Sequence, residues 1–187
     1  MQLEVRAMDA EKLTIGGRAI VFNSMSENLG WFREIIKPEA MNGVLERSTD
    51  VVALFNHDVN MILGRTTSST LRLLLTDDGL DYEVDLPETR KDVYESIARG
   101  DVRQSSFGFT IAPKGEEWEQ DEEGKNVRNI TQIQRLYDVS PVTYPAYGDT
   151  SVAKRSFEEW VEASKEENHE AFHAWLDREE RIREMFF

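Results

Sequence analysis

Cysteine is missing from this sequence of 187 residues. Without it, disulfides, thiolate zinc sites, iron–sulfur clusters and cysteine nucleophiles are all excluded. Long apolar runs are missing too, because no window approaches the roughly 18 consecutive apolar residues of a membrane span. The first residues also lack the basic and then apolar layout of a signal peptide. We therefore expect a soluble protein that is not exported and has no membrane partner.

Positive charge is scarce. The chain has 22 Lys and Arg residues against 36 Asp and Glu residues, which gives a formal net charge of -14. This charge opposes binding to a phosphate backbone, so we expect no nucleic-acid partner. Hydrophobic residues still make up 40% of the chain, and four residues are tryptophan, so the composition predicts a folded protein.

Short apolar runs bounded by turn formers predict most of the secondary structure. Residues 13–22 and 50–56 are typical strands, and alternating leucines predict a β-hairpin over 69–86. A strand is expected at 103–111 and a second hairpin from about 118 to 136.

Other signals predict helices and an edge strand. Pro38 suits the first turn of a short helix. Thr89 is expected to cap a second helix, which Gly100 ends. The two prolines of residues 137–147 predict an edge strand followed by a loop.

These elements predict a β-rich α+β domain over residues 1–150. Residues 151–187 are expected to form a linker and an acidic amphipathic helical tail, because apolar residues keep near-helical spacing from Ser156 onward. The apolar stripe of the tail needs burial. We expect it to pack on the domain, to pair with a second copy in a homo-oligomer, or to engage scaffold.

Polar residues with catalytic potential lie where propensity predicts buried strands, in segments 55–58, 104–109 and 137–141. Together they offer a serine nucleophile, a histidine base and a carboxylate. A serine hydroxyl needs an imidazole to accept its proton, and a carboxylate fixes the imidazole tautomer. Of the three histidines, only His57 lies at the end of a predicted strand, from which a ring can be aimed rigidly.

Ser106 is the preferred nucleophile. By strand alternation it shares a face with Gly108, while Ser105 shares the other face with Phe107 and Phe109. If the phenylalanine side is core, Ser106 points to the surface beside a glycine that leaves room for a substrate backbone. Ser105 remains an alternative if a bulge shifts the register.

The chain resembles a known family over roughly residues 13 to 150. It contains, in order, GRAIVFN, LFNHD followed by ILGRT, a helix ending in ARGD, SSFGF, and LYDVSPVTYPAY. This ordered set is similar to the prohead proteases of tailed bacteriophages of the HK97 type, which are regarded as related in fold to the herpesvirus assemblins. The resemblance implies a partly open, assemblin-like β-barrel with surrounding helices.

The resemblance also implies site residues. The histidine of the NHD motif is His57, and the serine immediately before FGF is Ser106. The acidic position before VSPVT is Asp138, which is expected to orient His57, although Asp58 beside the histidine is an alternative. No metal or organic cofactor is implied.

The implied activity is that of a serine endopeptidase of viral capsid maturation. Its expected partners are the major capsid protein and its scaffolding segment, which it would cleave together with itself. It would act in the host cytoplasm, inside the assembling prohead. A catalytically silent scaffold- or capsid-binding module of the same fold is the alternative from a different functional class.

A rival motif lies in the tail. His169-Glu170-Ala171-Phe172-His173 matches the HExxH pattern of zinc metallopeptidases, which places two imidazoles on one helix face. The residues that follow lack the glycine and third histidine of the metzincins, and the preceding flank is strongly polar. We therefore favour two partly exposed helix histidines over a zinc site.

Overall fold

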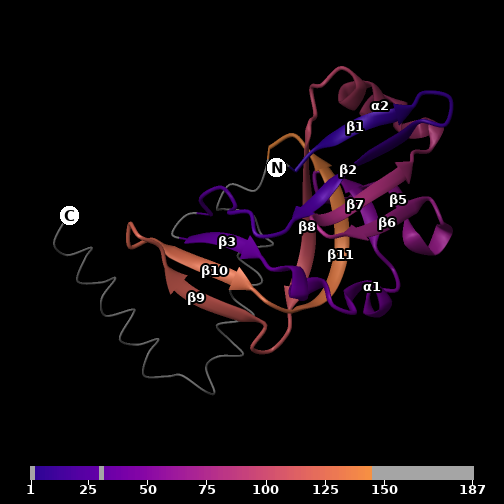
Figure 1. The fold of residues 1–187 in the computed structure, drawn as a ribbon. Helices are drawn as coiled ribbons and strands as arrows, with labels where there is room; N and C mark the ends of the chain where they lie inside the picture. The colour runs from indigo at the N-terminus through magenta and orange to yellow at the C-terminus, as the bar shows by residue number, and fades with distance from the viewer. Residues whose placement is uncertain (1–2, 30–31, 145–187) are drawn as a thin grey trace. The chain divides into compact units, whose positions relative to one another are not determined.

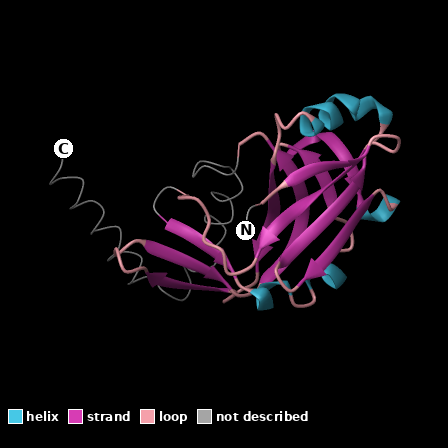
Figure 2. Ribbon diagram, turned by 45° about the horizontal axis from the view of Figure 1, so that its top comes forward, coloured by secondary structure: helices cyan, strands magenta, loops and turns pink. Residues whose placement is uncertain are grey.

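The computed structural model describes residues 3–29 and 32–144. In these residues the chain is mostly β-structure with a few short helices (Figures 1 and 2). The strands are β1 (Val5–Asp9), β2 (Thr14–Val21), β3 (Phe32–Ile36), β4 (Val52–Phe55), β5 (Asp58–Arg65), β6 (Leu71–Thr76), β7 (Gly79–Asp85), β8 (Gln104–Ile111), β9 (Glu116–Gln120), β10 (Asn126–Ile130) and β11 (Ile133–Val142). The helices are η1 (Pro38–Met41), α1 (Val44–Arg47), η2 (Thr66–Ser68), η3 (Glu88–Arg90) and α2 (Lys91–Ala98), where η marks a 3-10 helix. The predicted β-rich α+β class is confirmed.

The strands form three sheets. Two have four strands each, in the orders β1-β2-β7-β6 and β5-β4-β11-β8, and the third has the order β3-β10-β9. Figure 1 shows β3, β10 and β9 as a separate group with β10 in its centre. Hydrogen bonding does not close the described strands into a barrel. The assemblin-like arrangement therefore stays a prediction, as do the boundary near residue 150 and the tail, which lie outside the described residues.

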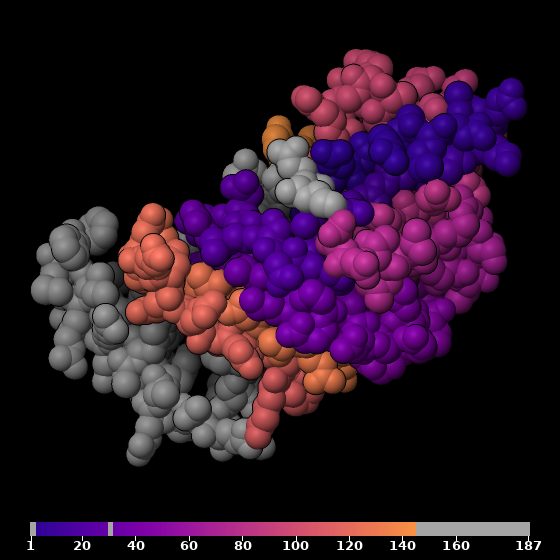
Figure 3. Space-filling model, viewed as in Figure 1, coloured from indigo at the N-terminus to yellow at the C-terminus, as the bar shows by residue number. Residues whose placement is uncertain are grey.

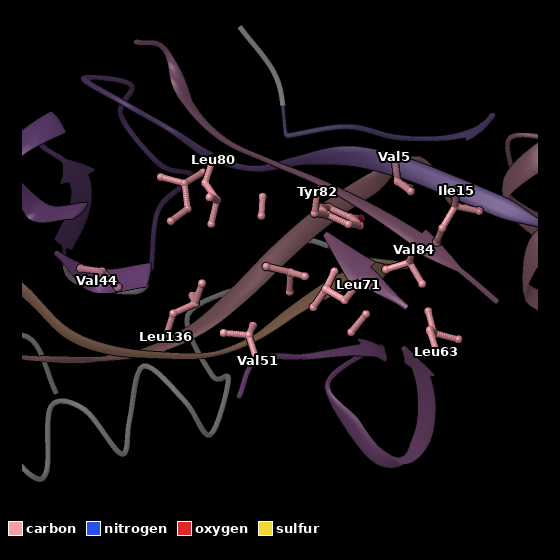
Figure 4. Packing of buried hydrophobic residues seen from close by; sticks show 14 of the residues in the cluster. Val5, Ile15, Val44, Val51, Leu63, Leu71, Leu80, Tyr82, Val84 and Leu136 are labelled. Carbon is pink, nitrogen blue, oxygen red and sulfur yellow. The ribbon is translucent and has the colours of Figure 1, made fainter. Parts of the chain in front are cut away.

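The two four-stranded sheets contribute more than half of the hydrophobic core, and residues of β3, β10, η1, α1 and α2 also belong to it. Leu80, Tyr82 and Val84 of β7 belong to the same buried cluster as Leu63 of β5 and Leu136 of β11 (Figure 4). Every second residue of β7 is buried, as the alternation in the sequence predicts. The core therefore fixes the inner face of the β5-β4-β11-β8 sheet and leaves its other face for chemistry.

The predicted hairpins and helix positions are largely confirmed. β6 and β7 pair antiparallel up to Thr76 and Gly79, and β9 pairs antiparallel with β10. Pro38 begins η1, and Gly100 ends the second helix with a left-handed φ of 79°. Helix α2 packs against β1, which lies beside it at the surface (Figure 3).

Two local predictions were wrong. Thr89 lies inside η3, and Arg90 at the N-cap of α2 makes no side-chain capping bond. β11 is an inner strand rather than an edge strand, because it pairs with β8 on one side and with β4 on the other. Pro141 is tolerated there because pairing with β4 covers only Asp138 and Val139. Among the described residues, no helix is long and apolar enough to cross a membrane.

The three-stranded sheet buries a charged group at its centre. Arg128 of β10 is 2% exposed and forms ion pairs with Glu116 of β9 and Glu34 of β3. Its guanidinium carbon lies 5.9 Å from the ring centroid of Phe32 and 5.8 Å from that of Trp118. Burial raises the pKa of Glu34 to about 7, while Arg128 opposes the rise and Glu116 adds to it.

This raised pKa predicts a pH-dependent stability. The folded protein keeps a proton on Glu34 that the unfolded chain releases near pH 4.5, so the contribution of this group to stability falls as the pH rises from about 4.5 to 7. We expect Glu34→Gln to match the wild type near pH 4 and to be more stable at pH 8, by as much as about 3 kcal/mol. Denaturant unfolding at both pH values measures the difference.

The matched control is Glu117→Gln on β9, whose side chain is exposed. This variant should follow the pH dependence of the wild type. Identical pH profiles for the wild type and Glu34→Gln would contradict the burial argument.

Candidate active site

His57 lies in a tight turn between two strands. β4 ends at Phe55 and β5 begins at Asp58, and these two residues are paired, so the turn consists of Asn56 and His57 alone. Both turn residues have left-handed φ angles, 53° for Asn56 and 57° for His57. Two such residues define the turn type that best matches the twist of a hairpin. Asparagine adopts this conformation readily, whereas at histidine it costs on the order of 1 kcal/mol.

Asn56 fastens this turn to β11. Its backbone N–H donates to the carbonyl of Pro141 at 3.0 Å. Its side-chain oxygen accepts the N–H of Thr143 at 2.8 Å, and its amide nitrogen donates to the hydroxyl of Thr143 at 3.2 Å. These three bonds hold the adjacent His57 at a fixed place beside β11.

Asp138 is the carboxylate that contacts His57. Its Oδ2 lies 2.6 Å from Nδ1 of His57 and accepts a second hydrogen bond from the hydroxyl of Ser140 at 2.7 Å. Asp138 is only 9% exposed. The carboxylate of Asp58, the alternative, instead accepts hydrogen bonds from the backbone and side-chain nitrogens of Asn60. The structure thus pairs His57 with Asp138.

Irregular pairing of β11 turns Asp138 away from the core. Leu136 and Val139 both belong to the hydrophobic core, although they are three residues apart. The register with β8 shifts between Leu136 and Asp138, so Tyr137 is an extra residue. In a regular strand Asp138 would share the face of Leu136, whereas after the shift it faces away from Val139.

Ser106 shares a face of the sheet with this pair. β8 lies beside β11 (Figure 1), and in their pairing Ser106 lies opposite Ser140 while Gly108 lies opposite Asp138. Directly opposed residues of antiparallel strands point to the same side. Ser106 is half-buried. Within the described residues no hydrogen bond joins it to His57.

Ser105 lies on the other face. It is fully buried, its hydroxyl donates to the carbonyl of Glu4 at 2.9 Å, and it also bonds the hydroxyl of Tyr82 at 2.8 Å. Burial raises the pKa of Tyr82, which keeps its phenol neutral. Ser105 is therefore a structural link between β8 and the opposite sheet, and the geometry favours Ser106 of the two candidate serines.

Gly108 serves a different purpose from the one predicted. We expected its missing side chain to leave room for a substrate backbone. A Cβ atom built there would instead lie only 2.2 Å from Oδ1 of Asp138. The carboxylate occupies the space that the missing side chain leaves, because Asp138 lies directly opposite Gly108 in the pairing of β11 with β8.

Two residues around the site escaped the sequence analysis. Ser140 was in a segment of interest but had no assigned task, although its i+2 spacing from Asp138 could have placed it on the same face. Asn56 precedes the histidine, and its tolerance of the left-handed conformation was the available signal. Its bonds to Thr143 join residues 87 apart in sequence and could not be inferred.

In the described part of the chain, no three His, Asp or Glu residues come close enough together to hold a metal ion. The HExxH motif at 169–173 lies outside the described residues.

Ser106 offers a hydroxyl on the sheet face that carries the imidazole of His57 and the carboxylate of Asp138. A hydroxyl, an imidazole and a carboxylate are the three groups that serine hydrolases use. A model of the caudovirus prohead serine protease family matches residues 1–163. The chain belongs to this family. Searches of curated proteins and of solved structures gave no significant match.

Membership suggests a serine protease of capsid maturation. It also implies interaction with capsid proteins and action inside the assembling viral procapsid of an infected cell. The predicted resemblance to the prohead proteases is thereby confirmed.

Because Asp138 fits closely against Gly108, we expect position 108 to be sensitive to substitution. Gly108→Ala should displace the carboxylate by about 1 Å and break its bond to His57, because the added methyl overlaps Oδ1. A misplacement of this size costs on the order of 100-fold in rate. Peptidase activity and a structure of the variant would test both parts.

Gly115→Ala is the matched control, since its added Cβ would lie 2.4 Å from the carbonyl oxygen of Gln132, near the opposite end of β8 and β11. It should lose stability and keep activity. Full activity of Gly108→Ala would contradict this prediction, because it would show that the carboxylate of Asp138 can move and still hold His57.

Proposed function

We propose that this chain is a serine endopeptidase that cleaves the scaffolding segment of the major capsid protein, and itself, during prohead maturation. Ser106 is the nucleophile, His57 the general base and Asp138 the residue that orients the histidine. One observation supports this assignment most strongly: the 2.6 Å contact of His57 Nδ1 with Asp138 Oδ2, on the face that carries Ser106.

This contact determines what the imidazole can do. With the Nδ1 proton directed to Asp138, the lone pair of Nε2 is free to accept the proton of Ser106. Such hydrogen bonds are often long before the substrate binds and shorten in the reacting complex. The nearly buried carboxylate also stabilises the imidazolium that forms, because little water screens the two charges.

The reaction then proceeds in two half-reactions, acylation and deacylation, and His57 acts as base and then as acid in each. Oγ of Ser106 attacks the peptide carbonyl carbon while His57 takes the hydroxyl proton. His57 passes that proton to the leaving amine as the C–N bond breaks, which leaves an acyl-enzyme. Water attacks the ester with His57 again as base, and the proton returns to Ser106 as the acid product leaves.

Mass spectrometry of single variants tests the assignment. Produced alone, the wild type should shorten itself with time. Produced together with the major capsid protein, it should shorten both chains. Ser106→Ala and His57→Ala should leave both masses unchanged, because each removes a group that every turnover needs; rate losses of 1,000-fold or more, on the order seen for such residues, are expected.

Ser105→Ala is the matched control on the same strand. It removes a buried hydroxyl on the opposite face, so the folded variant should still cleave. Cleavage by Ser106→Ala that a chelator stops would favour the zinc motif. A wild type that cuts nothing in the presence of capsid protein would favour the catalytically silent module.

A further inference from the structure

We propose that Ser140 is a positioning residue for the reaction: its hydroxyl fixes the carboxylate of Asp138 in the orientation that aims His57 at Ser106. This inference rests on the proposed function and adds a fourth residue to it. Ser140 touches neither of the reacting atoms and acts through Asp138.

The hydrogen bonds around Asp138 carry the argument. Ser140 Oγ lies 2.7 Å from Oδ2 of Asp138, and His57 Nδ1 lies 2.6 Å from the same oxygen. Distances this short are typical of bonds to an ionised acceptor. A serine hydroxyl has a single proton, and in this geometry that proton is directed to the carboxylate. Ser140 therefore supplies the second donor to the oxygen that holds the imidazole.

Burial explains why a second donor matters. Ser140 is fully buried and Asp138 is 9% exposed, so little water can replace a missing hydrogen bond. A buried carboxylate is costly unless donors compensate for its lost hydration. The other oxygen, Oδ1, lies against Gly108. With Ser140 on one oxygen and Gly108 beside the other, the carboxylate is held at both ends.

His57 and Ser140 both donate to the carboxylate of Asp138. Without the Ser140 hydroxyl, His57 would be the only one of these two donors left. The group could then rotate and exchange its two oxygens, or tilt toward solvent. Either movement changes the direction in which His57 points, because the ring follows its acceptor. The same geometry leaves Ser140 unsuited to be a nucleophile, since it is fully buried and its proton is already engaged.

Kinetics of Ser140→Ala test the proposal. With a peptide that spans the cut made by the wild type, we expect kcat to fall on the order of tenfold and KM to stay unchanged, since alignment and not binding is lost. The far-downfield proton NMR signal of the His57 Nδ1–H should shift or broaden. Ser140→Thr, which keeps the hydroxyl, should recover both the rate and the signal.

Ser48→Ala is the matched control. Ser48 is 4% exposed, and its hydroxyl accepts the N–H of Leu136 on the same strand as Asp138. This variant loses a comparable buried hydrogen bond, so it should be less stable but keep the wild-type kcat and NMR signal.

The outcomes separate this inference from the proposed function. A Ser140→Ala enzyme with wild-type kcat and an unchanged signal would overturn the positioning role alone. Wild-type protein that cuts nothing would overturn the proposed function, and the His57 signal would still report whether Ser140 positions Asp138. An equal loss of kcat in Ser48→Ala would show a general effect of destabilisation and would also overturn the inference.

Discussion

The antiparallel pairing of β8 with β11 is the interaction on which the candidate site depends. It places Ser106 opposite Ser140 and Gly108 opposite Asp138, so that four residues from two segments share one surface. Side chains alternate along a strand, and a slip of one residue would send each of them to the other face. The core resists such a slip, because Leu136 and Val139 would then have to leave it.

The second constraint is the turn that carries His57. Left-handed φ angles are unfavourable for most side chains, and this turn of two residues has no additional residue that would let Asn56 and His57 adopt other angles. Bonds from Asn56 to β11 compensate for this strain. The imidazole is therefore held from two directions, by the backbone turn on one side and by Asp138 on the other.

Local patterns in the sequence predicted what is local in the structure. The alternation of β7 and the opposite facing of Ser105 and Ser106 on β8 follow from a period of two residues, and the turn between β6 and β7 follows from its turn-forming residues. The inner position of β11 did not, because strand pairing depends on segments far apart in the chain. The two prolines of residues 137–147 favoured an edge strand, but Pro141 lies beyond the two residues of β11 that pair with β4.

The bulge in β11 shows why the site needed more than periodicity. Regular alternation from the buried Leu136 would have placed Asp138 in the core, where a carboxylate is unfavourable. The extra residue Tyr137 reverses the facing of everything that follows. The sequence offered Asp138 as a carboxylate within a predicted strand, and the family resemblance favoured it over Asp58, but only the pairing with β8 explains its position. One inserted residue thus lets a single strand support the core with Leu136 and Val139 while Asp138 and Ser140 lie on its opposite face.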